Sequence, residues 1–337
     1  MNEKEFNMYN GIQAQVVDQV DMNKITPILH HIKTCWANDN DDIYDYIIHW
    51  FRHCFLKPWE KTGIVILLHG IEGTGKGILI DNLIIPYIYG DNLACVSQGL
   101  TPITQRFNSI CMNKLFICCN EVSSEGGFHM SFEKLKAIIT DKTISIEKKG
   151  IDIFKDYPNY INFIFTTNNT DSVKLGKTDR RYCCLDTSSR YKGDYDYFDM
   201  LLAYCNQETA NHFYTYCIRY EKTRNIRNIP MTNLKKDMLL NATTSVEKFI
   251  EDVRYLLDNV TDETLSSVFE NEYKWDDYIL STRATKTREI TSRTLYSSYT
   301  KWCSENNETR KSKTLFGREA KKFTKQKRTK KDRLFLF

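Results

Sequence analysis

The chain has 337 residues, of which 41% are hydrophobic and 27% are charged, and its formal net charge at pH 7 is +4. This composition indicates a globular protein with room for a large core domain and one or two smaller modules. Apolar runs stay well short of the roughly 18 residues of a membrane span, and the N-terminus lacks an apolar signal segment, so we expect neither a membrane protein nor a secreted one.

Residues 1–62 are expected to form a helical N-terminal region. Apolar residues recur at close to 3.6-residue spacing from Ile43 to Phe55, which is typical of an amphipathic helix. Asp41 and Asp42 precede this run and are predicted to cap the helix, and Pro58 is predicted to end it.

Residues 63–222 alternate short apolar segments with amphipathic ones. Near-continuous apolar strands separated by helices indicate an α/β fold with a parallel sheet covered on both faces. Cysteine pairs inside two of these strands predict buried free thiols in a reducing compartment. Helices are expected over 77–89, 102–112, 131–140 and within 195–220. The predicted strands are Ile64–Leu68, Leu93–Ser97, Lys114–Cys119, Tyr160–Thr166 and Tyr182–Asp186.

Two further regions follow the predicted sheet domain. Residues 223–284 are assigned to a helical linker region and residues 285–337 to a small basic module. Between Arg310 and Arg333 there are twelve Lys and Arg residues and two acidic ones. Such a run is either a solvated tail or a nucleic-acid contact, and composition leaves both open. A stripe on the helix predicted from Ser292 is expected to be core: Leu295, Tyr296, Tyr299 and Trp302.

The segment between the first predicted strand and the next helix matches the Gly-x4-Gly-Lys part of a phosphate-binding P-loop. Its glycines let backbone N–H groups point at phosphate oxygens, and the following helix adds its positive end. A glycine-rich turn that binds nothing is the alternative. Gly77 stands where most such loops have the Ser or Thr hydroxyl that holds Mg²⁺. The residues expected to bind ATP are Gly70, Ile71, Glu72, Gly73, Thr74, Gly75, Lys76, Gly77 and Ile78.

Polar residues at the ends of later strands complete the expected catalytic set. Glu121 follows the strand Lys114–Cys119 and is predicted to polarise the attacking water and to hold Mg²⁺ together with waters. Asn120, beside it, stands where many ATPases have Asp. Asn168 follows the strand Tyr160–Thr166 and is predicted to orient the water and sense the γ-phosphate, with an Asn-rich turn as the alternative.

Arg180 and Arg181 precede the fifth predicted strand. In a ring-shaped ATPase, an arginine in this place reaches the nucleotide of the neighbouring subunit. A surface ion pair with Asp179 is the alternative.

The order and spacing of these motifs resemble those of the superfamily 3 helicases of DNA viruses and mobile elements. Within that group the chain is most similar to the poxvirus-type and the phage or plasmid primase-helicases, in segments such as EGTGKG, KLKAIITDKTISIEKKGID and IPMTNLKKDML. TLYSSYTKWCSENN and SKTLFGREAKKF resemble the C-terminal winged-helix segment of the group. The resemblance covers nearly the whole chain and is most specific over residues 64–186.

This resemblance implies an AAA+-like P-loop core with Lys76, Glu121 and Asn168 as catalytic residues. It implies Arg181, with Arg180 as the other possibility, as an arginine finger between subunits of a homohexameric ring. The implied activity is that of an ATP-dependent DNA helicase that moves on single-stranded or forked DNA.

The segment with Lys148 and Lys149 resembles the DNA-contacting hairpin of these helicases; without the resemblance it would be interpreted as a solvated turn. The primase domain often found upstream in the group is not expected in this chain, so a separate primase or polymerase is an expected partner. The expected location is the cytoplasm or a host replication site such as a virus factory or the nucleus.

Other functions stay open on the sequence. Gly77 and Asn120 each remove a magnesium contact, which would suit a DNA-binding scaffold that binds nucleotide with little or no hydrolysis. Adenylate-kinase-like loops also contain Gly-Lys-Gly, but they lie near the N-terminus of shorter chains, and no Arg-rich lid segment is evident here. A DNA-packaging ATPase shares the first two motifs without accounting for the C-terminal similarity.

Overall fold

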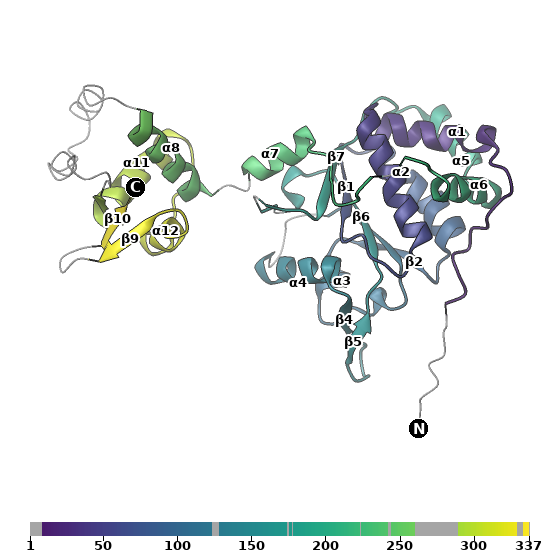
Figure 1. Cartoon of the computed structure of the whole chain (residues 1–337), viewed down its shortest axis with the longest axis horizontal. Coiled ribbons are helices and arrows are strands. Elements are labelled where there is room, and N and C mark those ends of the chain that lie inside the picture. Colours follow the sequence, from purple (N-terminus) through teal and green to yellow (C-terminus); the bar gives the residue numbers. More distant parts are fainter. Residues whose placement is uncertain are drawn as a thin grey trace. The chain divides into compact units, whose positions relative to one another are not determined.

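The computed structural model describes residues 9–122, 128–173, 175–176, 178–222, 224–241, 244–259, 289–328 and 333–336 (Figure 1). The chain divides into two units, Met1–Leu240 and Asn241–Phe337. The domain boundaries expected at 62/63, 222/223 and 284/285 stay predictions. None of the helices within the described ranges is long and apolar enough to cross a bilayer.

Five strands form the central sheet of the first unit, in the order β2-β3-β6-β1-β7. Every neighbouring pair is parallel, so the carboxyl ends of all five strands meet at one edge of the sheet. The predicted α/β fold with a parallel five-stranded sheet is therefore confirmed. The strands are β1 (Val65–His69), β2 (Ala94–Gln98), β3 (Phe116–Asn120), β6 (Asn162–Thr167) and β7 (Tyr182–Asp186).

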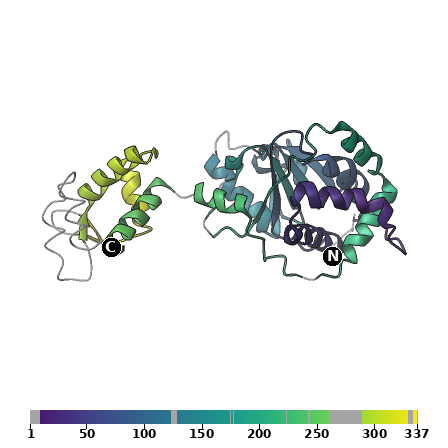
Figure 2. The same cartoon turned by 90° about the horizontal axis from the view of Figure 1, so that it is seen from above.

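Successive residues of each strand contribute to two separate cores. In β1, Ile66 and Leu68 lie in one core while Val65 and Leu67 lie in the other, as the two-residue repeat of a strand requires. β6 is buried along its whole length, which explains its nearly continuous apolar sequence. Figure 2 shows the strands between the purple N-terminal helices on one side and, on the other, α4 (Phe128–Thr140, blue-teal) and α7 (Asn233–Asn241, green).

The first core lies beneath helices from both ends of the unit. α2 (Asp41–Leu56) packs on α6 (Gln207–Ile218) and buries Trp50 and Phe51 completely. Its cap is Asn40, whose side chain accepts from the backbone N–H of Ile43 at 3.0 Å. The predicted cap at Asp41–Asp42 was thus one residue late, and both acids lie in the first turn. The other elements of this face are α1 (Met22–His31), η1 (Ile32–Trp36), η2 (Ile80–Tyr89) and α5 (Tyr195–Ala203).

The second core holds the most evident local error of the sequence prediction. The helix expected over 102–112 is wrong, because the chain forms only the single turn α3 (Thr101–Thr104) and, after a break, the 3₁₀ turn η3 (Ser109–Cys111). The Asn108 side chain bonds the Ser145 carbonyl and the Glu147 N–H, each at 3.0 Å, which holds this segment against the neighbouring hairpin. The other elements here are α4 (Phe128–Thr140), β4 (Thr143–Ile146), β5 (Phe154–Pro158), η4 (Thr170–Ser172) and α7 (Asn233–Asn241).

The second unit has its own apolar core beside an antiparallel sheet of order β8-β10-β9. α8 (Ser245–Asn259), which falls in the predicted linker region 223–284, contributes Phe249 to this core. The stripe expected to be core is confirmed: Leu295 and Tyr299 are fully buried, and Tyr296 and Trp302 pack against them. The remaining elements are β8 (Glu289–Thr291), α11 (Ser292–Glu305), α12 (Lys313–Ala320), β9 (Lys325–Arg328) and β10 (Arg333–Leu336).

Candidate functional site

The loop between β1 and η2 has a backbone that only glycine accommodates at key positions. Gly75 has φ +83°, and a Cβ there would lie 2.7 Å from the Phe198 ring and 2.8 Å from the His31 ring. Gly70 has φ +157°, and a Cβ there would lie 2.2 Å from Thr187 Oγ1. The spacing of glycines in the sequence therefore reflects both backbone conformation and close packing around the loop.

Lys76 folds back over this loop and meets the end of β6. Its Nζ donates to the carbonyls of Gly70 at 2.6 Å and Ile71 at 2.7 Å, and to Asn168 Oδ1 at 2.9 Å. Asn168 Nδ2 in turn lies 3.4 Å from Glu72 Oε1. Burial lowers the pKa of Lys76, and the Glu72 carboxylate opposes this shift. The structure thus brings together two residues that lie 92 positions apart and that the sequence assigned to one site.

Glu121 lies at the same edge of the sheet, directly after β3. Its side chain is exposed, and its φ of +52° is the left-handed conformation that non-glycine residues adopt rarely. The preceding residue, Asn120, is hydrogen-bonded within the sheet: its Oδ1 accepts from Thr166 Oγ1 and from the Cys118 thiol, each at 3.2 Å. A strained carboxylate-bearing residue at the carboxyl end of a central strand is a common feature of functional sites.

His31 contacts the loop from α1, and the sequence interpretation did not assign it to the site. Its Nε2 lies 3.0 Å from the Gly75 carbonyl and its Nδ1 lies 3.0 Å from the Tyr197 hydroxyl. A carbonyl only accepts, so Nε2 carries the proton and Nδ1 accepts from Tyr197. Burial lowers the pKa of His31 to about 4, so the ring is neutral near pH 7. Its position as the last residue of α1 gave no signal of this contact.

The two arginines of the predicted finger have different surroundings. Arg181 donates its backbone N–H and a guanidinium N–H to the Asp179 carboxylate, at 2.8 and 3.2 Å. Arg180 is exposed, and no ion pair joins it to a residue in the described part of the chain. Within one chain, therefore, Arg180 has the freer side chain.

Lys148 and Lys149 lie in the connection between the antiparallel strands β4 and β5, which Figure 1 shows at one end of the unit. Lys149 is exposed and Lys148 is half-buried. The same connection exposes the apolar side chains of Ile151 and Ile153, by 54% and 48%. The tip therefore offers cationic and apolar groups together.

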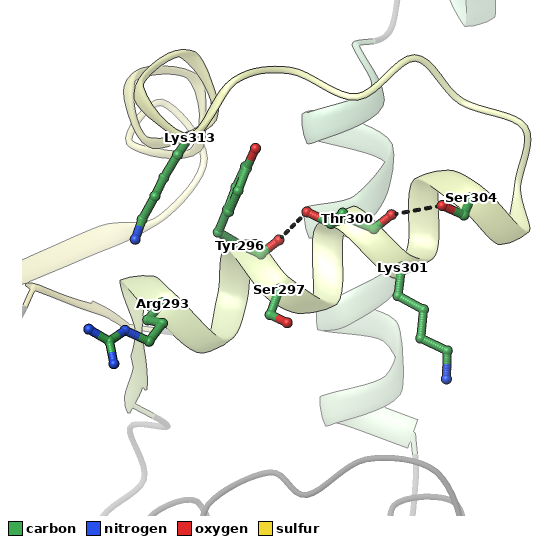
Figure 3. Close-up of a pocket in the computed structure, with 7 residues that line it drawn as sticks. All are labelled: Arg293, Tyr296, Ser297, Thr300, Lys301, Ser304 and Lys313. Carbon is green, nitrogen blue, oxygen red and sulfur yellow. Dashed lines mark hydrogen bonds between the residues drawn. The ribbon is translucent and has the colours of Figure 1, made fainter.

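A groove of about 500 Å³ lies along α11 and the start of α12 in the second unit (Figure 3). Its lining side chains are basic or carry hydroxyl groups. Tyr296 also contributes the apolar face of its ring, and its hydroxyl donates to the Lys311 carbonyl. Lys301 lies 3.7 Å from Glu305, an exposed pair one helical turn apart. The Thr300 and Ser304 hydroxyls donate to backbone carbonyls of the same helix, so the charge of the lining comes from its Lys and Arg side chains. The lining residues are Arg293, Tyr296, Ser297, Thr300, Lys301, Ser304 and Lys313.

Known proteins resemble this chain over different lengths. Residues 68–181 match a family described as a family of unknown function, DUF5906. The DNA primase-polymerase of Nitratiruptor phage NrS-1 is 27% identical over 231 residues, which make up 65% of this chain and 31% of that protein. The chain therefore spans about a third of the length of this curated relative.

Solved structures extend the comparison to nearly the whole chain. An apo structure of the NrS-1 C-terminal region superposes with a TM-score of 0.68 at 19% identity, covering 96% of this chain and 77% of that one. A second, A-form apo structure gives 0.66 with the same coverage. The JCV helicase, at a TM-score of 0.33 and 11% identity over 75% of this chain, is too distant to carry an argument. The chain thus has the fold of the NrS-1 C-terminal region and is similar in sequence to part of a phage DNA primase-polymerase.

Proposed function

We propose that this chain is the ATPase motor of a superfamily 3 DNA helicase that serves the replication of a virus or mobile element. The observation that carries this proposal is the contact of Lys76 with the loop and with Asn168, at 2.6 and 2.9 Å. A phosphate-binding lysine and a polar residue from the adjacent strand meet at one point, as phosphoryl transfer to water requires. The sequence similarity to a phage DNA primase-polymerase supports a role in replication.

In the proposed reaction, the loop and Lys76 hold the β- and γ-phosphates of ATP. Asn168 orients the attacking water, and Glu121 accepts its proton, since the exposed carboxylate at the end of β3 is free to take it. Mg²⁺, when bound, would neutralise the phosphate charge. Glu121 fits this ion chemically, because Mg²⁺ prefers hard carboxylate oxygens and needs only one or two from the protein.

Ring assembly would complete the site with an arginine from the neighbouring subunit. Arg181 was the preferred finger on the resemblance, yet its guanidinium is held by Asp179 within the same chain. The exposed Arg180 is therefore the better candidate to reach across, with Arg181–Asp179 fixing its backbone. A homohexamer, with an AAA+-like core in each subunit, is part of this proposal.

Single-stranded or forked DNA is the proposed track. Lys148 and Lys149 at the tip of the β4–β5 connection would contact the phosphate backbone, which carries charge but no sequence information. The groove along α11, in a module we propose to be winged-helix-like, would add a second, salt-sensitive contact through Arg293 and Lys313. A separate primase or polymerase is a proposed partner, and a host replication site is the proposed location.

Replacing Lys76 tests the proposed site. Lys76→Ala is expected to lower ATP hydrolysis by about 100-fold or more, since it removes the cation that faces the transferred phosphate. Lys114→Ala is a matched control, because Lys114 Nζ also donates to two backbone carbonyls, those of Asp91 and Asn92, away from the loop. Hydrolysis that survives Lys76→Ala would remove this loop from the mechanism.

Two residues favour a second function, that of a scaffold protein. Gly77 has no hydroxyl for Mg²⁺, and the Asn120 side-chain oxygen already accepts a hydrogen bond from Thr166. Both features fit a scaffold that binds nucleotide and DNA without turnover. The same experiment separates the two functions: a scaffold binds ATP in a Lys76-dependent manner while the wild-type protein shows no hydrolysis above the variant.

A further inference from the structure

Asp81 occupies the space beside Gly77 that a longer side chain would use. A Cβ built on Gly77 would lie 3.1 Å from Asp81 Oδ2, closer than any other neighbour. Asp81 comes one helical turn later, and its backbone N–H donates to the Gly77 carbonyl at 2.9 Å. Side chains on a helix lean toward its N-terminus, so the carboxylate points back at the loop.

The surroundings of this carboxylate suit a ligand role. No hydrogen bond or ion pair joins it to another residue within the described ranges. Asp81 is exposed at the surface, yet partial desolvation on the side that faces the loop raises its pKa. Burial and then the Asp81 charge raise the pKa of the Cys118 thiol, which lies on β3. η2, which carries Asp81, packs against β3, the strand that Glu121 follows.

We propose that the Asp81 carboxylate replaces the missing hydroxyl at position 77 as the ligand that the loop side offers to the divalent cation bound with a nucleoside triphosphate. This inference rests on the proposed function. Glu121 would be the ligand from β3, so two carboxylates from facing elements would flank the ion. Mg²⁺ takes oxygen ligands and is satisfied by one or two carboxylates with phosphate oxygens and waters.

A charged ligand in place of a neutral hydroxyl has a measurable consequence. Without a divalent cation, the carboxylate repels the phosphates that the loop attracts. With the cation, the same carboxylate binds it. Affinity for ATP is therefore expected to depend more strongly on Mg²⁺ in the wild-type protein than in a variant that lacks this charge.

The test measures the dissociation constant of the non-hydrolysed analogue AMP-PNP in EDTA and in Mg²⁺, for the full chain. In Asp81→Asn, affinity in EDTA should be equal to or higher than in the wild type, while the gain from Mg²⁺ falls by about tenfold. Asp91→Asn removes an equal charge from an exposed turn and should leave both values unchanged. Mn²⁺ titration of the nucleotide complex, followed by electron paramagnetic resonance, should show the same loss.

A rescue variant guards against a merely structural effect. Gly77→Ser in the Asp81→Asn background supplies the absent hydroxyl and should restore most of the Mg²⁺-dependent gain. Equal Mg²⁺ dependence in Asp81→Asn and the wild type would overturn the assignment of Asp81 while leaving the nucleotide site intact. A wild-type protein that binds no AMP-PNP in either condition would overturn the proposed function and, with it, this inference.

Discussion

His31 contacts the candidate phosphate-binding loop from outside the loop itself. Its ring N–H donates to the carbonyl of Gly75, directly before Lys76, and its ring stacks on Tyr197 at a centroid distance of 5.9 Å. Tyr197 stacks in turn on Tyr191 at 3.6 Å. α1 is thereby linked to the glycine-rich loop, and this hydrogen bond restrains the conformation of the loop.

The buried His31 predicts a specific dependence of stability on pH. Its pKa is lowered from 6.5 to about 4, so the unfolded chain binds a proton between these values that the folded chain does not. The stability that His31 contributes is present above pH 6.5 and is lost as the pH falls toward 4. Between pH 7 and pH 5, the wild type should lose about 2 kcal/mol more than His31→Gln.

Urea unfolding at the two pH values checks this expectation. His30→Gln is the matched control, because His30 is the exposed neighbour on the same helix. Equal pH dependence in the wild type and in His31→Gln would contradict the burial of a neutral ring at this position.

Single residues show why part of the site was predictable. Lys76 and its glycines form one continuous motif, and Asn168 ends an apolar strand, so both could be recognised from sequence. His31 could not, because 44 residues separate it from Gly75 and only packing brings them together. Asp81 was partly predictable. Its four-residue spacing from Gly77 is visible in the sequence, but a role as a ligand follows only from its position in the space that a side chain at 77 would fill.

At the scale of elements, the parallel sheet decides where the site forms. β1 pairs with β6 through Leu68 and Thr166, and β3 pairs with β6 through Cys119 and Phe165. The residues that follow these strands are therefore neighbours at one edge. The five strands of the central sheet could be predicted from apolar runs, whereas β4, β5 and the strands of the second unit were not predicted from such runs. The segment 102–112 depends on a tertiary contact of Asn108 that propensity does not contain.

We expect ATP turnover to act on DNA through the β4–β5 connection. Lys149→Ala should leave the rate of ATP hydrolysis unchanged and lower the unwinding of forked DNA by about tenfold, because it removes a phosphate contact. Lys155→Ala, on exposed β5 away from the tip, is the control. Unwinding that is unaffected by Lys149→Ala would exclude this connection from the translocation mechanism.

At the scale of the whole molecule, the chain combines an α/β unit that holds the candidate site with a second unit that carries a basic groove. The chain matches 31% of the NrS-1 primase-polymerase, so the similarity concerns only part of that larger protein. In the proposed ring, an arginine of one subunit would enter the candidate site of its neighbour.

We propose that this chain hydrolyses ATP with Glu121 and couples hydrolysis to DNA. The most direct measurement is the ATP hydrolysis rate of the purified protein, with and without single-stranded DNA, its oligomeric mass being determined in the same buffer. We predict hydrolysis that DNA accelerates and that Glu121→Gln lowers by about 100-fold while ATP binding persists. A rate that neither DNA nor Glu121→Gln changes would contradict it.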